Sequence, residues 1–107
     1  MRILGFSKKW PKLQNNTFTT FRFKRKDRDW EIGEVVQIVY KPRSKNREVL
    51  GVAEIVTKEV RLGAKDDEEA RADGFQDCRD MEAWMTKTYG VAKTWQPMHK
   101  LMLRWKK

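Results

Sequence analysis

The sequence TFTTFRF occupies residues 17–23 and runs directly into the basic triplet KRK at residues 24–26. Threonine and phenylalanine favour the pleated surface of a sheet, and alternation places Phe21 and Phe23 on one face with Thr20 and Arg22 on the other. We therefore predict a strand here, with Arg22 in a cleft. A guanidinium fixed in a cleft can bind a phosphate or a nucleobase edge through two hydrogen bonds. The alternative is a structural ion pair with a carboxylate such as Glu54 or Asp73.

Four more strands are predicted around this segment, over residues 2–6, 34–40, 48–61 and 100–106, from apolar runs and clean alternation. Residues 10–13 form one helical turn, in which Pro11 is tolerated near the start. Gly51 lies inside the longest strand and permits a bulge or a tight bend, as small closed barrels need. We expect a barrel or a strongly bent sheet.

Two helices are predicted after the long strand, because the hydrophobic period changes there. The first covers residues 67–73, with a capping-box pattern at Asp66 and a stop at Gly74. The second begins after Asp77 and ends at Gly90. Residues 91–97 form a loop. One helical stripe, which we interpret as core contact, contains Cys78, Met81, Met85 and Thr88.

The composition predicts a single globular domain, residues 1–107, since 39% of the residues are hydrophobic and 36% are charged. No apolar run approaches the length of a membrane span, and the N-terminal apolar stretch is too short for a signal peptide. We expect a cytoplasmic monomer. Cys78 is the only cysteine and His99 the only histidine, 21 positions apart, so we expect no internal disulfide, metal site or cofactor.

Positive charge is concentrated near the two ends of the chain. The net charge is +9, and residues 1–30 hold nine Lys/Arg against two Asp/Glu, a local charge of +7. Cations alternating with aromatic rings are typical of proteins that bind unpaired RNA, with the rings stacking on bases if they are exposed. The alternative is a solvated basic loop beside two core tryptophans. The predicted RNA-contacting residues are Lys8, Lys9, Trp10, Lys12, Thr20, Arg22, Lys24, Arg25, Lys26 and Trp30.

The order of several short motifs resembles the ASCH domain family of the PUA-like superfold, and the resemblance covers essentially the whole chain. Individually the motifs are weak, and their order carries the resemblance. They are an initial strand, Thr20-x-Arg22, Trp30-x-x-Gly33-x-x-Val36, Leu50-Gly51-x-Ala53-x-Ile55, an acidic helix ending Ala72-Asp73-Gly74-Phe75, and a helix with Met81, Trp84 and Met85.

This resemblance implies an α+β fold: a small PUA-like β-barrel of about five to six mostly antiparallel strands, with two helices packed at its side. It also implies RNA binding. Some bacterial members hydrolyse acetylcytidine, with a lysine three residues before the threonine of Thr-x-Arg and an acid after the first acidic helix. Thr20 matches that threonine and Asp73 approximates the acid, but the lysine position is Thr17. Lys12 is the remaining candidate for the amine.

Three functional hypotheses follow. The favoured one is a non-catalytic module that binds RNA or an RNA-derived nucleotide. The second is a nucleoside amidohydrolase acting on acylated cytidine, with Thr20 as nucleophile, Lys12 as base and Asp73 as proton carrier. The third is a protein-interaction module whose acidic helix, residues 66–73, docks a basic partner. Convergence of Lys12, Thr20, Arg22 and Asp73 on one pocket would favour the first two hypotheses.

Overall fold

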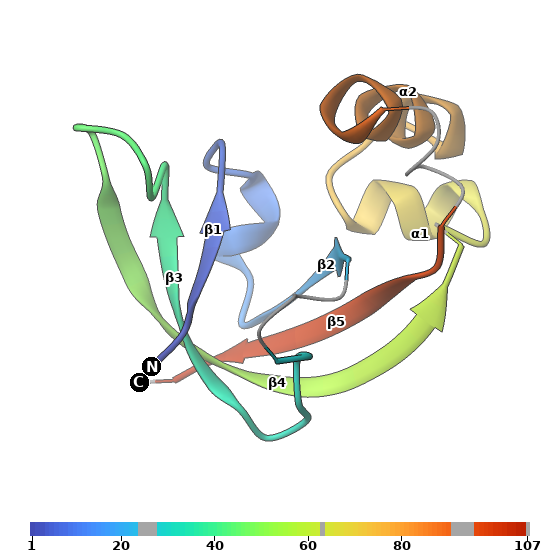
Figure 1. Ribbon diagram of the computed structural model, residues 1–107. Coiled ribbons are helices and arrows are strands. Elements are labelled where there is room, and N and C mark those ends of the chain that lie inside the picture. The colour runs from blue at the N-terminus through green and yellow to red at the C-terminus, as the bar shows by residue number, and fades with distance from the viewer. Residues whose placement is uncertain (24–27, 63, 91–95, 107) are drawn as a thin grey trace.

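A computed structural model describes residues 1–23, 28–62, 64–90 and 96–106 of the chain. Five strands form one strongly curled sheet, and two α-helices stand together at one end of it (Figure 1). The elements in chain order are β1 (Ile3–Phe6), the 3-10 turn η1 (Pro11–Gln14), β2 (Thr17–Arg22), β3 (Val35–Tyr40), β4 (Glu48–Arg61), α1 (Asp67–Ala72), α2 (Cys78–Tyr89) and β5 (Met98–Trp105).

The strand order is β1-β3-β4-β5-β2, with a parallel pairing between β1 and β3 and antiparallel pairings elsewhere. The α+β class is confirmed, but the sheet is a half-barrel, not a closed barrel. The edge strands β1 and β2 share no ladder in the part of the chain that the structure describes. A side chain bridges them instead, because the Arg22 Nη2 group donates to the Gly5 carbonyl oxygen at 2.7 Å.

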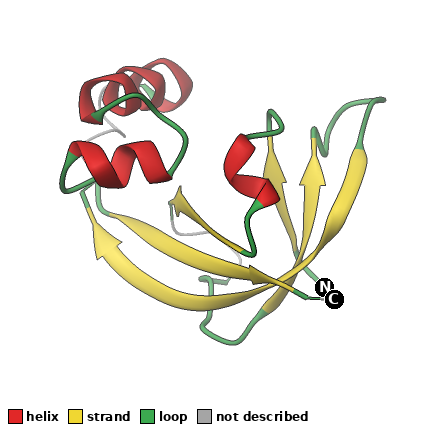
Figure 2. Cartoon of the chain, turned by 180° about the vertical axis from the view of Figure 1, so that it is seen from behind, coloured by secondary structure: helices red, strands yellow, loops and turns green. Residues whose placement is uncertain are grey.

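The curl of the sheet follows from the length of β4, whose 14 residues pair with two different strands. Its first part lies against β3 and its last part against β5, so the strand turns from one wall of the half-barrel to the other (Figure 2). A register shift leaves Leu50 as an extra residue beside Gly51, which has a φ of +150°. The predicted bulge at Gly51 is therefore confirmed.

Both predicted helices are confirmed to within a residue at their ends. Asp66 caps α1 by accepting the Glu69 N–H at 2.8 Å, and Asp77 caps α2 by accepting the Asp80 N–H at 2.8 Å. Gly90, with a φ of +91°, follows the last turn of α2. Within the described ranges, no helix is long and apolar enough to cross a membrane.

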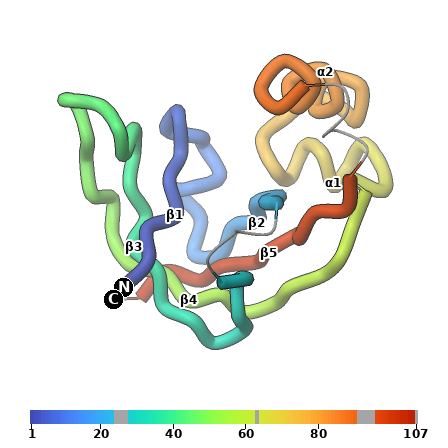
Figure 3. The backbone as a smooth tube through the Cα atoms, in the orientation of Figure 1, coloured from blue at the N-terminus to red at the C-terminus, as the bar shows by residue number. Residues whose placement is uncertain are grey.

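The core lies inside the curl of the sheet and continues beneath the helices. Inward-facing strand residues such as Ile38, Ile55 and Leu103 are fully buried. Met81 and Met85 extend this core from α2, as the helical stripe predicts, whereas Thr88 at the end of that stripe is exposed. The two chain ends lie close together at the opposite end of the molecule from the helices (Figure 3). The helices therefore lie at the end of the molecule away from the termini, near the gap between the edge strands β1 and β2.

Candidate functional site

A cavity of about 190 Å³ lies where the edges of β1 and β2 meet η1, the end of α1 and α2. Its polar lining includes four residues from three separate segments of the sequence, namely Lys12, Thr20, Arg22 and Asp73. These four were named together from the sequence, and the fold brings all of them to one concave surface. The rest of the lining is largely aromatic: Phe6, Trp10, Phe21, Phe75, Trp84 and Tyr89.

Lys12 and Asp73 form a buried ion pair at the base of the cavity. Pro11 opens the single turn η1, which directs Lys12 inward, and Asp73 is the C-cap residue of α1. The Lys12 Nζ atom lies 3.1 Å from Asp73 Oδ1, and each side chain is only 6% exposed. The same carboxylate oxygen accepts the Thr19 hydroxyl at 3.0 Å. The pair therefore satisfies its charges internally, as buried charges must.

Burial shifts both members of this pair toward their neutral forms. Removal from water lowers the pKa of the Lys12 ammonium below its usual value, and the Asp73 carboxylate opposes that shift without cancelling it. Removal from water likewise raises the pKa of Asp73, against the stabilising effect of Lys12 and Thr19. Perturbed ionisable groups around a cavity are a recognised mark of functional sites.

Arg22 lies on the wall between the two edge strands and is held in three ways. Its Nε–H donates to Thr20 Oγ1 at 3.1 Å, and its Nη2 donates to the Gly5 carbonyl at 2.7 Å. The guanidinium also lies 4.7 Å from the centre of the Phe6 ring. The alternative pairing with Glu54 is wrong, because Glu54 instead contacts Lys106 at 3.0 Å.

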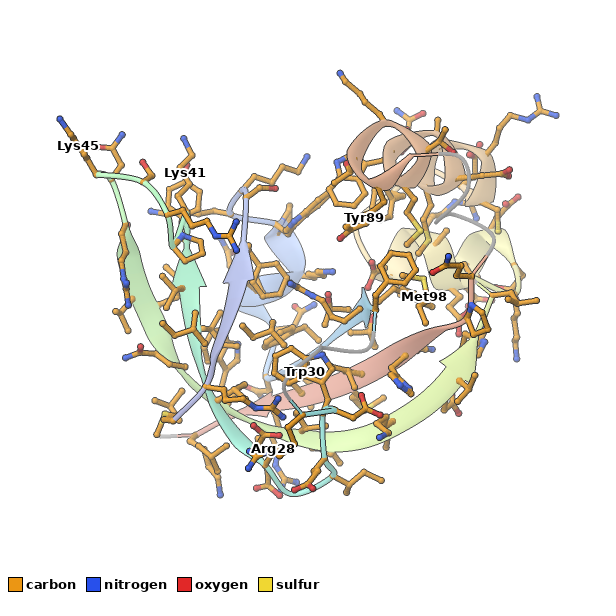
Figure 4. The ribbon with its side chains drawn as sticks, viewed as in Figure 1. Arg28, Trp30, Lys41, Lys45, Tyr89 and Met98 are labelled. Carbon is orange, nitrogen blue, oxygen red and sulfur yellow. The ribbon has the colours of Figure 1, made fainter. Side chains whose placement is uncertain are left out.

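The aromatic wall contains a connected cluster centred on Trp84 of α2. Trp84 packs against Trp10, Phe75 and Tyr89, with ring centres 5.6 to 6.1 Å apart. Figure 4 shows Tyr89 at the end of α2, on the side that faces the opening of the sheet. Rings of this kind provide flat apolar surfaces that accept another planar group.

The two tryptophans that we expected to stack on bases if exposed do not meet that condition. Trp30 is 3% exposed and lies in the core, with the Arg2 guanidinium 4.5 Å from its ring centre. Trp10 is 7% exposed, and its ring is covered by Lys8 Nζ at 3.9 Å. Trp10 contributes to the cavity wall but offers no open stacking platform, so the stacking surface must come from other rings.

The predicted lysines divide into three groups. Lys12 is buried, pairs with Asp73 and lines the cavity, so its contact to RNA stays a prediction and would lie inside the cavity. Lys8 and Lys9 are exposed, although Lys9 pairs with Glu48 at 2.8 Å. The remaining predicted RNA contacts, Lys24, Arg25 and Lys26, lie outside the described residues, as does Trp95 of the predicted loop.

Sequence reasoning missed part of the site. Strict alternation places Thr19 on the opposite face from Thr20, so only Thr20 was selected, yet the Thr19 hydroxyl binds Asp73. Trp84 was named only as a helix motif residue and Tyr89 was not selected at all, yet both are half-buried and line the cavity.

The acidic helix offers less free charge than its sequence suggests. Glu69 is bound by Arg61 and by Lys100 at 2.5 Å, and the Asp67 carboxylate accepts the Cys78 N–H at 3.0 Å. Two of the acidic side chains in this helix are thus engaged inside the molecule, which weakens the case for a docking surface there. Among the residues that the structure covers, no cluster of His, Cys, Asp or Glu could hold a metal ion.

No protein-family model, curated protein or solved structure matches this chain.

Proposed function

We propose that this protein is an RNA-binding module of the ASCH type, in which the cavity receives a single unpaired base. One observation carries the proposal: Lys12, Thr20, Arg22 and Asp73, from three separate segments of the sequence, line a cavity walled by aromatic rings. Stacking on aromatic side chains together with polar contacts to a base edge is how proteins recognise unpaired bases in RNA.

The size of the cavity favours one base over a longer stretch of RNA. Pockets for drug-sized ligands usually enclose roughly 300–1,000 Å³, and this cavity, at about 190 Å³, is smaller. A planar base fits such a space, while the sugar and phosphate remain outside. The net charge of +9 then favours a polyanion over a neutral metabolite as the molecule that carries the base.

The test is the binding of a fluorescently labelled, single-stranded RNA hexamer, followed by anisotropy at low salt. Arg22→Gln removes a cavity guanidinium and should weaken binding about tenfold or more, as expected for a lost hydrogen bond to a charged group. Arg104→Gln removes the same charge from the exposed face of β5 and serves as the control. Tyr89→Leu, which leaves the charge unchanged, should also weaken binding. No binding of the hexamer by the unmodified protein would refute the proposal.

A second candidate, hydrolysis of an acylated cytidine, is favoured by the buried lysine. Because burial lowers the pKa of Lys12, a neutral amine is more accessible there than at the surface. In this reaction Thr20 Oγ attacks the acyl carbon and its proton passes to Lys12. The cytidine amine then leaves with a proton, and water hydrolyses the acyl-threonine. Against it, Thr20 Oγ1 accepts a hydrogen bond from Arg22, whereas Lys12 pairs with Asp73.

Incubation with acetylcytidine and chromatography of the products separates this candidate from simple binding. Release of cytidine that disappears in Thr20→Val would support the hydrolase, and release that persists in Thr20→Val would refute the assigned nucleophile. Binding of the RNA hexamer without any release of cytidine would leave the binding module as the function.

A further inference from the structure

A second concave surface adjoins the cavity, and of the residues that line it only Arg22 and the buried Trp30 were among the predicted RNA contacts. It is an open groove of about 700 Å³ between β1 and the loop of residues 41–47, which joins β3 to β4. Gly5 and Arg22 line both the groove and the cavity, so the two are continuous. Arg43 and Arg47 add two cations from the loop.

The loop of residues 41–47 carries four exposed cations. Lys41, Arg43, Lys45 and Arg47 are all exposed, and none of them forms an ion pair with a residue that the structure describes. The adjacent acid, Glu48, is already paired with Lys9. Figure 4 shows Lys41 and Lys45 pointing outward from the loop, on the other side of the opening from Tyr89. Free cations on one side of a groove favour an extended anionic ligand.

The loop is also held in a fixed shape. Lys41 has a φ of +47°, the one positive φ at a non-glycine residue in the described chain, and its N–H donates to the Phe6 carbonyl at 2.8 Å. Two successive turns follow, closed by the Ser44 and Arg47 N–H groups at 3.0 and 3.2 Å. Pro42 packs so closely on Gly5 that a Cβ there would lie 2.6 Å from Pro42 Cγ.

This packing fixes the position of the loop relative to the cavity. Gly5 contacts Pro42 through its Cα and accepts the Arg22 guanidinium through its carbonyl. A preorganised set of cations loses less conformational freedom on binding than a flexible basic tail does. Lys41 also keeps a positive φ, which is unfavourable for lysine. Such strained backbone conformations are typical of functional loops.

We infer that the groove is the path of the RNA backbone on one side of the base in the cavity, with Arg43 and Arg47 contacting successive phosphates. This inference rests on the proposed function. It names a contact surface formed by the β3–β4 loop, whose cations were not among the predicted RNA contacts.

The test compares Arg43→Gln/Arg47→Gln with the control Lys65→Gln/Arg79→Gln, which removes two exposed cations from the helical end of the molecule. Each lost phosphate contact lowers the slope of log affinity against log salt by about 0.7 for single strands. The groove variant should therefore lose about 1.4 in slope for the RNA hexamer, and about tenfold in affinity at 0.15 M salt. Its binding of the four ribonucleosides, measured by fluorescence quenching, should not change.

The outcomes separate the two proposals. An unchanged slope in the groove variant, with binding still weakened in Tyr89→Leu, would overturn the groove and leave the base-binding cavity intact, because Tyr89 lines only the cavity. Equal losses in the groove and control variants would also overturn it, because they indicate diffuse charge without a defined path. Binding to heparin or anionic vesicles, without binding of the hexamer, would overturn both proposals.

Discussion

The buried pair between Lys12 and Asp73 is the feature on which the cavity depends most at the level of single residues. Removing one member leaves an uncompensated charge in the interior, so Lys12→Met should lower the free energy of unfolding by about 3–5 kcal/mol. The exposed pair between Lys9 and Glu48, with side chains 54% and 53% exposed, is the matched control. Lys9→Met should change stability by less than about 1 kcal/mol. Urea unfolding at neutral pH measures both changes.

The double variant Lys12→Met/Asp73→Asn sharpens this prediction. Because the second change removes the stranded carboxylate, the double variant should lose less stability than the two single variants added together. Additive losses would show that the two groups do not interact and would contradict the pairing.

Gly74 allows the Trp10 ring to pack closely against the backbone after α1. Alanine substitutions at Gly74 and Gly90 test this role. Both Gly74 and Gly90 have a positive φ, +112° and +91°, so alanine is strained at either position. A Cβ at Gly74 would also lie 2.8 Å from Cε3 of Trp10, whereas nothing lies within 4 Å of one at Gly90. Gly74→Ala should therefore be more destabilising than Gly90→Ala by about 1–3 kcal/mol in thermal or urea unfolding. Equal losses would mean that Trp10 moves aside freely.

Which residues take part in the site could be predicted only in part. Arg22 was found from alternation within its strand, whereas Thr20, Asp73 and Lys12 were added through the motif resemblance. Whether Trp30 is exposed could not be read in the same way, since burial of a ring depends on which distant segments cover it. Here Arg2, the residue before β1, covers it.

At the level of elements, the Glu69 carboxylate connects α1 to the sheet through two ion pairs. Glu69 is bound by Arg61 of β4 and by Lys100 of β5. Burial alone raises the pKa of Glu69, but the hydrogen bonds from these two cations outweigh burial and lower the pKa from 4.5 to about 2. The helix therefore depends on an ionised Glu69.

This lowered pKa predicts that the free energy of unfolding decreases at acidic pH. A depressed carboxyl pKa contributes stability that is complete above pH 4.5 and is lost as the pH falls toward 2. The loss should be about 3 kcal/mol at most, reduced by partial exposure to solvent. Glu69→Gln should flatten the free energy of unfolding across this window, and the exposed Glu68→Gln should not. The check is urea unfolding at a series of pH values; an identical decrease at acidic pH in Glu69→Gln would contradict the assignment.

The strands and helices were largely predictable, because their signals are local. Alternation, caps and the glycine bulge each depend on residues close together in the sequence, as at Asp66, Asp77 and Gly51. Closure of the barrel was not predictable in this way. It depends on whether β1 and β2 come close enough to pair, and in this chain Arg22 crosses the gap with its side chain instead of a ladder.

For the molecule as a whole, positive charge is concentrated both in residues 1–30 and in the β3–β4 loop. The sequence directs attention to residues 1–30, where the local charge is +7. The fold adds the β3–β4 loop, a basic segment that was not among the predicted RNA contacts. It lies within residues 31–60, which are neutral overall, with five basic and five acidic residues. Its cations become one surface only because the acids of that segment pair elsewhere, as Glu34 does with Arg2 at 2.5 Å and Glu54 with Lys106.

The most direct test of the base-binding cavity uses the methionine methyl groups as NMR reporters. Met85 lines the cavity and Met1 lines the adjoining groove, whereas Met98 and Met102 on β5 line neither surface. With methyl-labelled methionine, titration of the single-stranded RNA hexamer should shift the Met85 resonance and leave those of Met98 and Met102 unchanged. Binding of the hexamer with no shift of Met85 would show that RNA stays on the basic surface, and would contradict the central claim that a base enters the cavity.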